Sequence, residues 1–119
     1  MPFTSLPNMA FNWPNDPSLE ERVTDLFRKG GEYDFGRLVQ LVHPASQDEL
    51  RLLLGALVRS GQLHLVFRVE SPTRHGGIED FSSIDEIPEH IDDWRAGGQR
   101  IDVNHENLRV LYEARYDGR

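Results

Sequence analysis

Between Ser46 and Glu70, the spacing of apolar residues changes from that of a helix to that of a strand. Ser46 and Glu49 stand at the capping-box spacing that begins a helix, and Gly61 follows the last residue of the helical repeat. After Gly61, apolar residues recur at every second position: Leu63, Leu65, Phe67 and Val69. We therefore expect a helix over residues 46–61 that leads directly into a β-strand.

Two amphipathic segments precede this helix. Asp16 as N-cap and Pro17 at the first position predict a helix over residues 17–29. Asp34 predicts the N-cap of a second helix over residues 35–42, which Pro44 ends. The three helices share one expected core: Leu19, Val23, Leu26, Phe27, Phe35, Leu38, Val39, Val42, Leu50, Leu53, Leu54, Leu57 and Val58.

The segment after the first strand is rich in turn residues and then in acids. Residues 71–77 predict an exposed tip, and Ser83 with Glu86 predicts a short helix that continues through Ile87 and Ile91. The alternation over residues 108–116 predicts a second strand. Antiparallel pairing of this strand with residues 63–70 gives a small sheet that covers the helices.

Residues 1–15 show no sustained period and contain three prolines, so we interpret them as an irregular N-terminal arm. Its aromatic residues, including Phe11 and Trp13, either pack on the chain's own domain or anchor a partner or a second copy of the chain. The remaining residues, 16–119, are interpreted as one domain.

Composition narrows the function. The 119 residues contain no cysteine, which excludes disulfides and thiol catalysis, and no apolar run of membrane-spanning length. We therefore expect a cytoplasmic protein that does not enter a membrane. The 20 acidic residues exceed the 13 basic ones, and the formal charge of −7 disfavours nucleic acid as a partner.

Residues 34–69, DFGRLVQLVHPASQDELRLLLGALVRSGQLHLVFRV, resemble a winged helix-turn-helix domain. The resemblance implies an α+β, winged-helix-like fold: three N-terminal helices followed by a small antiparallel β-sheet with an acidic inserted segment. In DNA-binding members, a helix placed like residues 46–61 enters the major groove, and a wing placed like residues 71–77 touches the backbone or minor groove. The implied DNA contacts are Gln47, Arg51, Arg74 and His75.

Sites for catalysis or metal binding are not evident in the sequence. The five histidines are far apart, and no serine stands in a nucleophile elbow. Asp102, Asn104 and Glu106 match the start of a calcium loop, but its sixth position is Asn107 rather than glycine. We expect no cofactor, no metal and no enzymatic activity.

Surface recognition remains as the expected function. We interpret the chain as a non-enzymatic protein–protein interaction module, either an adaptor or an inhibitor of the immunity-protein type, that binds a basic partner surface. A homodimer through the arm or an edge strand stays open. The alternative is a DNA-binding transcriptional regulator that uses residues 46–61 and 71–77. The expected partner contacts are Phe11, Trp13, Glu86, Asp92, Asp93 and Trp94.

Overall fold

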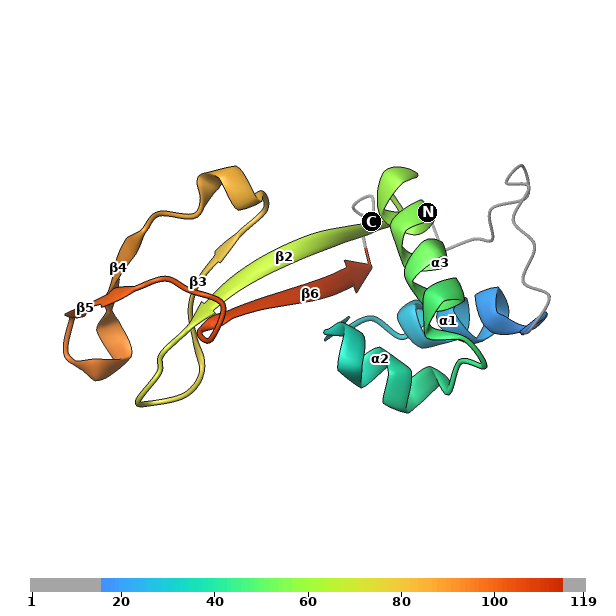
Figure 1. Cartoon of the computed structure of the whole chain (residues 1–119), viewed down its shortest axis with the longest axis horizontal. Coiled ribbons are helices and arrows are strands. Elements are labelled where there is room, and N and C mark those ends of the chain that lie inside the picture. The colour runs from blue at the N-terminus through green and yellow to red at the C-terminus, as the bar shows by residue number, and fades with distance from the viewer. Residues whose placement is uncertain (1–15, 115–119) are drawn as a thin grey trace. The chain divides into compact units, whose positions relative to one another are not determined.

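A computed structural model describes residues 16–114 and shows an α+β protein, with helices followed by antiparallel strands (Figure 1). This confirms the coarse fold class expected from the sequence. The predicted arm, residues 1–15, lies outside the described residues. The elements are α1 (Leu19–Arg28), β1 (Glu32–Tyr33), α2 (Phe35–Val42), α3 (Gln47–Arg59), β2 (Leu63–Glu70), β3 (Gly77–Phe81), the 3-10 turn η1 (Ile84–Glu86), β4 (His90–Asp93), the 3-10 turn η2 (Trp94–Ala96), β5 (Gln99–Asp102) and β6 (Leu108–Ala114).

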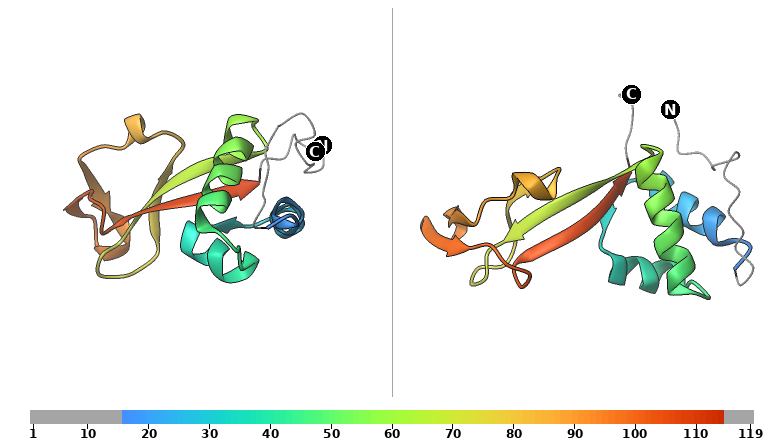
Figure 2. Two further views of the ribbon diagram at one scale, coloured as in Figure 1. Left: turned by 45° about the vertical axis from the view of Figure 1, so that its right-hand side comes forward. Right: turned by 45° about the horizontal axis from the view of Figure 1, so that its top comes forward.

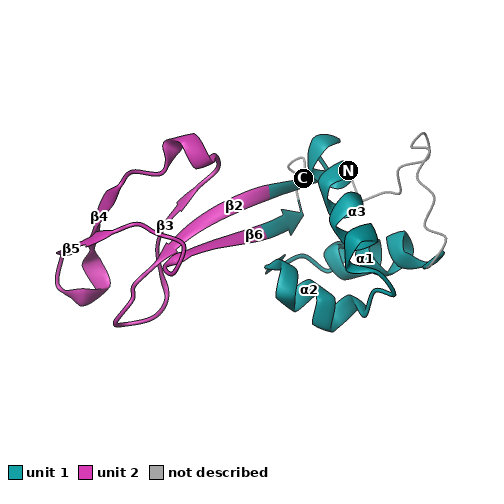
Figure 3. Cartoon of the chain, viewed as in Figure 1, with its two compact units in different colours: residues 1–64, 112–119 teal, residues 65–111 magenta. Residues whose placement is uncertain are grey.

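The chain divides into two compact units (Figure 3). Unit 1 comprises residues 1–64 and 112–119, and unit 2 comprises residues 65–111, so β2 and β6 contribute residues to both. The interpretation of residues 16–119 as one domain stays a prediction. None of the described helices is long and apolar enough to span a membrane.

The core of unit 1 lies among its three helices (Figure 2). Burial of each leucine or phenylalanine side chain contributes about 1.5–3 kcal/mol to folding, so this cluster supplies most of the driving force for unit 1. Leu63 and Ala114 join it from β2 and β6. The helical members are Leu19, Val23, Phe27, Leu38, Val42, Leu50, Leu53, Leu54 and Leu57.

The predicted caps of α2 and α3 are confirmed. Asp34 Oδ1 accepts a hydrogen bond from the Arg37 backbone N–H at 2.7 Å. Ser46 Oγ accepts one from the Glu49 N–H at 3.3 Å. Each bond satisfies one of the backbone donors that a helix leaves unpaired in its first turn. Gly61, predicted to end this helix, follows α3 with a left-handed conformation, φ 84°.

The predicted cap of α1 is wrong. The helix begins at Leu19 behind Ser18, which makes no side-chain cap bond. Asp16 is buried instead, and its Oδ2 accepts bonds from Arg22 Nη2 at 2.5 Å and from the Ala45 N–H at 3.0 Å. The Arg22 guanidinium is a stronger partner than a backbone N–H because its bond to the carboxylate is charge-assisted at both ends. Asp16 therefore joins the start of α1 to the segment before α3.

The larger sheet has the order β1–β6–β2–β3 within residues 16–114. β1 pairs antiparallel with β6 through Glu32↔Glu113 and Tyr33↔Tyr112. The sequence gives no signal for β1, because two residues are too few to show a period. The predicted strands over residues 63–70 and 108–116 correspond to β2 and β6, which are neighbours in this sheet.

The burial pattern of β2 differs from the predicted alternation. Leu63, Val66 and Val69 are buried, whereas Leu65 and Phe67 are half-buried. The buried positions are three residues apart for two reasons. Strands twist along their length, which rotates successive side chains away from a strict alternation. In addition, Leu63 belongs to unit 1 while Val66 and Val69 lie in unit 2, so one strand serves two interiors.

Unit 2 consists largely of two hairpins. β3 pairs antiparallel with β2, and residues 71–76 connect them; the predicted tip over residues 71–77 thus ends at the first residue of β3. β4 pairs with β5 in a separate sheet. The helix predicted to continue through Ile87 and Ile91 is wrong: Ser83 caps only the turn η1, and Ile91 lies in β4. Pro88 disfavours a helical conformation at Ile87, whose backbone is extended with φ of −77° and ψ of 121°.

Candidate functional site

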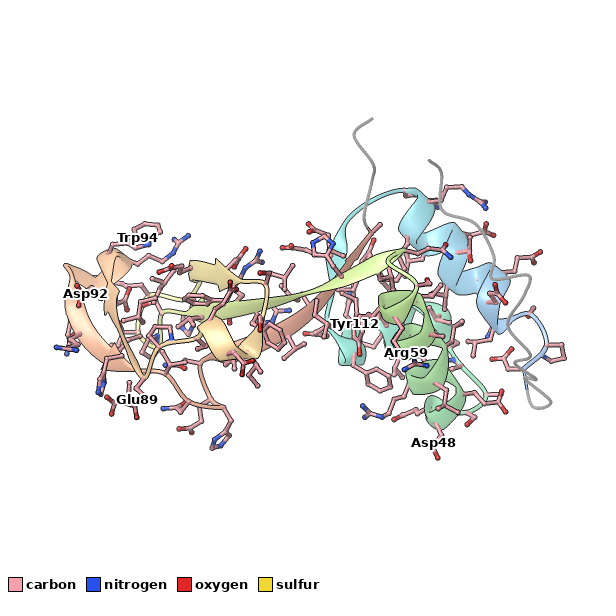
Figure 4. All side chains as sticks on the ribbon, turned by 90° about the horizontal axis from the view of Figure 1, so that it is seen from above. Asp48, Arg59, Glu89, Asp92, Trp94 and Tyr112 are labelled. Carbon is pink, nitrogen blue, oxygen red and sulfur yellow. The ribbon has the colours of Figure 1, made fainter. Side chains whose placement is uncertain are left out.

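Among the described residues, Trp94 is the one aromatic residue with a large exposed apolar side chain. It begins η2, directly after β4, and 61% of its surface is accessible to solvent. Its indole Nε1 donates a hydrogen bond to the Ile78 carbonyl at 3.0 Å, which fixes the ring on β3. Figure 4 shows the ring standing clear of the ribbon. The indole is therefore both ordered and available for contact.

Arg95 contacts both the Trp94 ring and β3. Its guanidinium carbon lies 4.5 Å from the centroid of the Trp94 ring, and its Nε donates to the Gly77 carbonyl at 2.8 Å. Gly76 provides the space: a Cβ there would lie 3.0 Å from the guanidinium carbon of Arg95. A cation over an aromatic face is favourable by about 0.5–1 kcal/mol at an exposed site. Two side chains of η2 are thus bonded to consecutive carbonyls of β3.

The base of η2 is fixed by a buried polar contact. Ser71, at the end of β2, donates from Oγ to Asp93 Oδ2 at 2.5 Å. Asp93 Oδ1 accepts the Arg95 backbone N–H at 3.1 Å, and Ser71 Oγ accepts the Arg74 N–H at 3.1 Å. One side-chain pair therefore organises two turns, the β2–β3 turn and η2.

A groove of about 410 Å³ lies beside this turn, within unit 2. Arg68 crosses to Asp80 on the neighbouring strand with two parallel bonds, from Nε at 2.8 Å and from Nη2 at 2.9 Å. The Arg68 guanidinium lowers the pKa of the Asp80 carboxyl, because it bonds the charged form. The groove is lined by Arg68, Gly77, Ile78, Glu79, Asp80 and Arg95.

Unit 2 is strongly acidic. Residues 65–111 contain ten acidic and five basic residues, so they hold five of the seven surplus negative charges of the chain. Arg68 and Arg109 are paired with Asp80 and Glu70, which further reduces the positive charge that is open to a partner. The exposed carboxylates are Glu79, Asp80, Asp85, Glu86, Glu89, Asp92, Asp102 and Glu106.

Four of the six residues predicted to contact a partner are described, and all four lie in unit 2. Glu86 is exposed in η1, where its Oε1 accepts bonds from Ser82. Asp92 is exposed on β4, and Asp93 is fully buried. Phe11 and Trp13 lie outside the described residues. Asp92 and Trp94 are thus both exposed on the surface, whereas Asp93 between them is buried.

The residues implied for DNA contact divide between the units. Gln47 and Arg51 are exposed on α3 in unit 1, and Arg74 and His75 are exposed in the β2–β3 turn of unit 2. The guanidinium carbon of Arg51 lies 3.9 Å from the centroid of the Phe35 ring. Arg51 is therefore already engaged with its own unit.

Two histidines contact carboxylates on adjacent strands, a feature that the sequence analysis missed. His64 Nε2 lies 2.8 Å from Glu113 Oε1, and His90 Nδ1 lies 2.7 Å from Asp102 Oδ1. The partners are far apart in sequence, so no local spacing reveals them. In residues 16–114, no group of three or more histidine, aspartate or glutamate side chains is placed to hold a metal ion.

No protein-family model matches the chain, and comparisons with curated proteins and with solved structures find no match. Function is therefore inferred from the chain's own residues. The sequence predicted Trp94 and Asp92 as site residues, but not Arg95 and Ser71. Both act through contacts with distant residues, for which a single sequence carries no signal.

Proposed function

We propose that this chain is a non-enzymatic protein–protein interaction module with a winged-helix-like fold. In this interpretation α2 and α3 form the helix-turn-helix, and β2 and β6 are the strands of the wing. Residues 71–107 are then a wing enlarged into an acidic recognition surface. The pairing of β1 with β6 supports this interpretation, because it joins the segment between the first two helices to a strand of the wing.

The observation that carries the proposal is the fixed, exposed indole of Trp94. Exposing a large aromatic side chain to water is unfavourable, and ordering it in advance lowers the entropic cost of binding. Tryptophan is also strongly enriched among the residues that contribute most to protein interfaces. The Trp94 ring is both ordered and exposed, since its Nε1 is bonded to Ile78 while most of its surface is open to solvent.

Charge indicates the kind of partner. The five surplus negative charges of unit 2 would attract a basic protein surface and repel an acidic one. Two exposed carboxylates lie on the segment that leads into Trp94: Glu89 directly before β4 and Asp92 within it. We propose Trp94 as the anchor, Asp92 and Glu86 as contributors of attractive charge, and Asp93 as the support that positions the turn. Both an adaptor and an inhibitor of a basic protein fit this description.

The alternative is a DNA-binding transcriptional regulator, favoured by the exposed Arg74 and His75 at the β2–β3 turn. Two observations weigh against it. The Arg51 guanidinium lies over the Phe35 ring, and this stacking restricts the positions from which it could contact a base. The acidic surplus of unit 2 would also oppose phosphate binding next to Arg74.

Affinity capture from nuclease-treated extract of the cells that make the protein tests the two functions. We expect a partner that is retained in stoichiometric amount and is lost with Trp94→Ala. Ile84→Ala is the matched control, because Ile84 is a similarly exposed apolar residue of unit 2, and it should retain the partner. Partner capture that survives Trp94→Ala would contradict the proposal. A salt-sensitive mobility shift with duplex DNA that Arg51→Ala and Arg74→Ala remove would favour the alternative.

A further inference from the structure

Within the part of the chain that the structure describes, β3 is an edge strand. The sheet order β1–β6–β2–β3 gives it a neighbour, β2, on one side. Backbone groups on the outer side of an edge strand can pair with an extended segment of another molecule. β3 spans Gly77–Phe81, a common length for a strand. It is therefore long enough to receive an added strand.

The groove of unit 2 follows β3. Four of its six lining residues are consecutive in β3, Gly77 to Asp80, and the other two are Arg68 and Arg95. Consecutive residues of one strand line a path along that strand rather than across the sheet. The groove thus runs along β3, the strand with which an added segment would pair, and extends to β2 at Arg68.

Side chains already occupy the first part of β3. The Gly77 carbonyl accepts Arg95 Nε and the Ile78 carbonyl accepts Trp94 Nε1. The register between β2 and β3 is also irregular here, since Glu79 faces Val69 while Gly77 faces Glu70. Side-chain donors and an irregular register both oppose regular pairing along an edge, so an added strand would begin after Ile78. The remaining residues of β3, Glu79 to Phe81, follow directly after the Trp94 contact. An incoming strand would pair there and meet the indole at one end.

The charge beside β3 defines the occupant. The groove holds two arginines and two carboxylates: Asp80 is bonded to Arg68, and Arg95 bonds the Gly77 carbonyl. Glu79 is therefore the groove carboxylate that can face an added cation, and the net negative charge comes from the surrounding surface of unit 2. In a strand, alternate side chains project to the same face. Lysine or arginine at alternate positions of an added segment would therefore face Glu79 and the surrounding acidic surface of unit 2.

We propose that unit 2 binds its partner by β-strand addition: an extended, lysine- or arginine-bearing segment pairs with Glu79–Phe81 at the edge of β3, and Trp94 packs against its end. This inference rests on the proposed function and specifies how the basic partner is held. In this mode of binding, backbone hydrogen bonds provide the affinity, and lysine or arginine side chains at alternate positions of the segment provide the selectivity.

Amide NMR of the full chain with synthetic peptides tests the inference. The probe is an eight-residue peptide of alternating lysine and valine, with a glutamate–valine peptide as control. We expect the lysine peptide to shift the amide signals of β3 and of Trp94, and to bind at least tenfold more tightly than the glutamate peptide. Shifts confined to β4 and β5, or to unit 1, would overturn the proposal.

Backbone pairing is separated from simple charge attraction by N-methylation of the peptide. Two further peptides carry N-methyl groups on all valines or on all lysines, because successive amides point to opposite edges of a strand. At least one of the two should bind more than tenfold more weakly than the parent. Equal binding of all three lysine peptides would overturn strand addition.

Two charge reversals give the matched test on the protein. Glu79→Lys should weaken the lysine peptide at least fivefold, whereas Glu106→Lys, which changes the net charge equally but lies outside the groove, should weaken it less than twofold. Equal effects would overturn the proposed site. Cellular partner capture that needs Trp94 but is unchanged in Glu79→Lys would leave the proposed function standing and reject strand addition alone.

Discussion

Ser71 and Asp93 are joined by a buried hydrogen bond of 2.5 Å between residues 22 positions apart, from Ser71 Oγ to Asp93 Oδ2. Asp93 is fully buried and Ser71 is 2% exposed, so neither group can exchange this partner for bulk water. Because Asp93 also receives the Arg95 N–H, the bond connects the end of β2 to the turn that presents Trp94. The position of the candidate anchor thus depends on two residues that would not themselves contact a partner.

Ser71→Ala tests this dependence. The change leaves the Asp93 carboxylate without its hydroxyl donor, and an unsatisfied buried polar group costs about 1–3 kcal/mol. We expect the free energy of unfolding to fall by this amount in urea titration, and amide exchange in η2 and β3 to accelerate. Thr73→Ala, an exposed change in the same turn, is the control and should have little effect. Equal stability of the two variants would contradict the proposed role of the bond.

The contribution of the Asp16 carboxylate to the free energy of unfolding should depend on pH. Its bond to Arg22 lowers the pKa of its carboxyl below the ordinary value of 3.8, so the contribution is present above that value. The contribution is lost as the pH falls through the lowered pKa of the folded state. Asp16→Asn should therefore destabilise at pH 7, by about 1.5–3 kcal/mol, and its difference from wild type should shrink in acid.

Urea titration of Asp16→Asn from neutral pH to below pH 3 measures this difference. Asp25→Asn is the control, since Asp25 is also paired with an arginine but is exposed. Surface ion pairs contribute about 0–1 kcal/mol, so its curve should nearly follow wild type at every pH. A difference for Asp16→Asn that stays constant with pH would exclude the charged carboxylate as the cause.

Gly76→Ala should loosen the Trp94 ring. Gly76 has φ of 113°, and an added Cβ would lie 3.0 Å from the guanidinium carbon of Arg95. Arg95 would have to shift, which disturbs its contacts with the ring and with the Gly77 carbonyl. Gly98→Ala separates this contact from backbone strain, because Gly98 also has positive φ but has no atom within 4 Å of the added Cβ. Side-chain NMR of the Trp94 indole should show greater mobility for Gly76→Ala only; equal mobility in both variants would attribute the effect to backbone strain.

Arg51→Ala should raise the pKa of Tyr112. Burial raises the pKa of this phenol, and the positive charge of Arg51 opposes the rise. Removing Arg51 leaves burial unopposed, so Tyr112 should ionise at a higher pH than in wild type. Carbon NMR of labelled tyrosine follows this titration, with Arg37→Ala as the control. An unchanged or lower pKa in Arg51→Ala would show that Arg51 does not influence the phenol.

The sequence predicted best what neighbouring residues determine. The Ser46 cap, the Asp34 cap and the Gly61 turn each depend on a few consecutive residues, and the structure contains all three. The same local reasoning gave the wrong cap at Asp16, because Arg22 and Ala45 offered its carboxylate other donors. It also placed a helix after Ser83, where the extended conformation of Ile87 before Pro88 ends the turn.

The candidate site was only partly predictable for the same reason. Trp94 and Asp92 stand out in sequence because an aromatic residue follows a run of acids. Their surroundings do not, because Ser71, Gly77 and Ile78 contact η2 across a separation of 16 or more residues. Such contacts follow from strand register, which is decided by the pairing of whole strands rather than by local spacing.

The last residue of β2, Glu70, and the residue before β6, Asn107, are hydrogen-bonded neighbours. The Glu70 N–H donates to the Asn107 carbonyl at 2.8 Å, and Arg109 bonds the Glu70 carboxylate at 3.2 Å. Both ends of the intervening 36 residues are therefore held together whatever that segment contains, and loop-closure entropy changes only slowly with loop length. A segment of another length or chemistry, or a short turn, could replace residues 71–106 with little entropic cost. Because Glu70 and Asn107 hold the two ends together, residues 71–106 are a segment where new binding specificities can be exchanged in evolution or grafted by design.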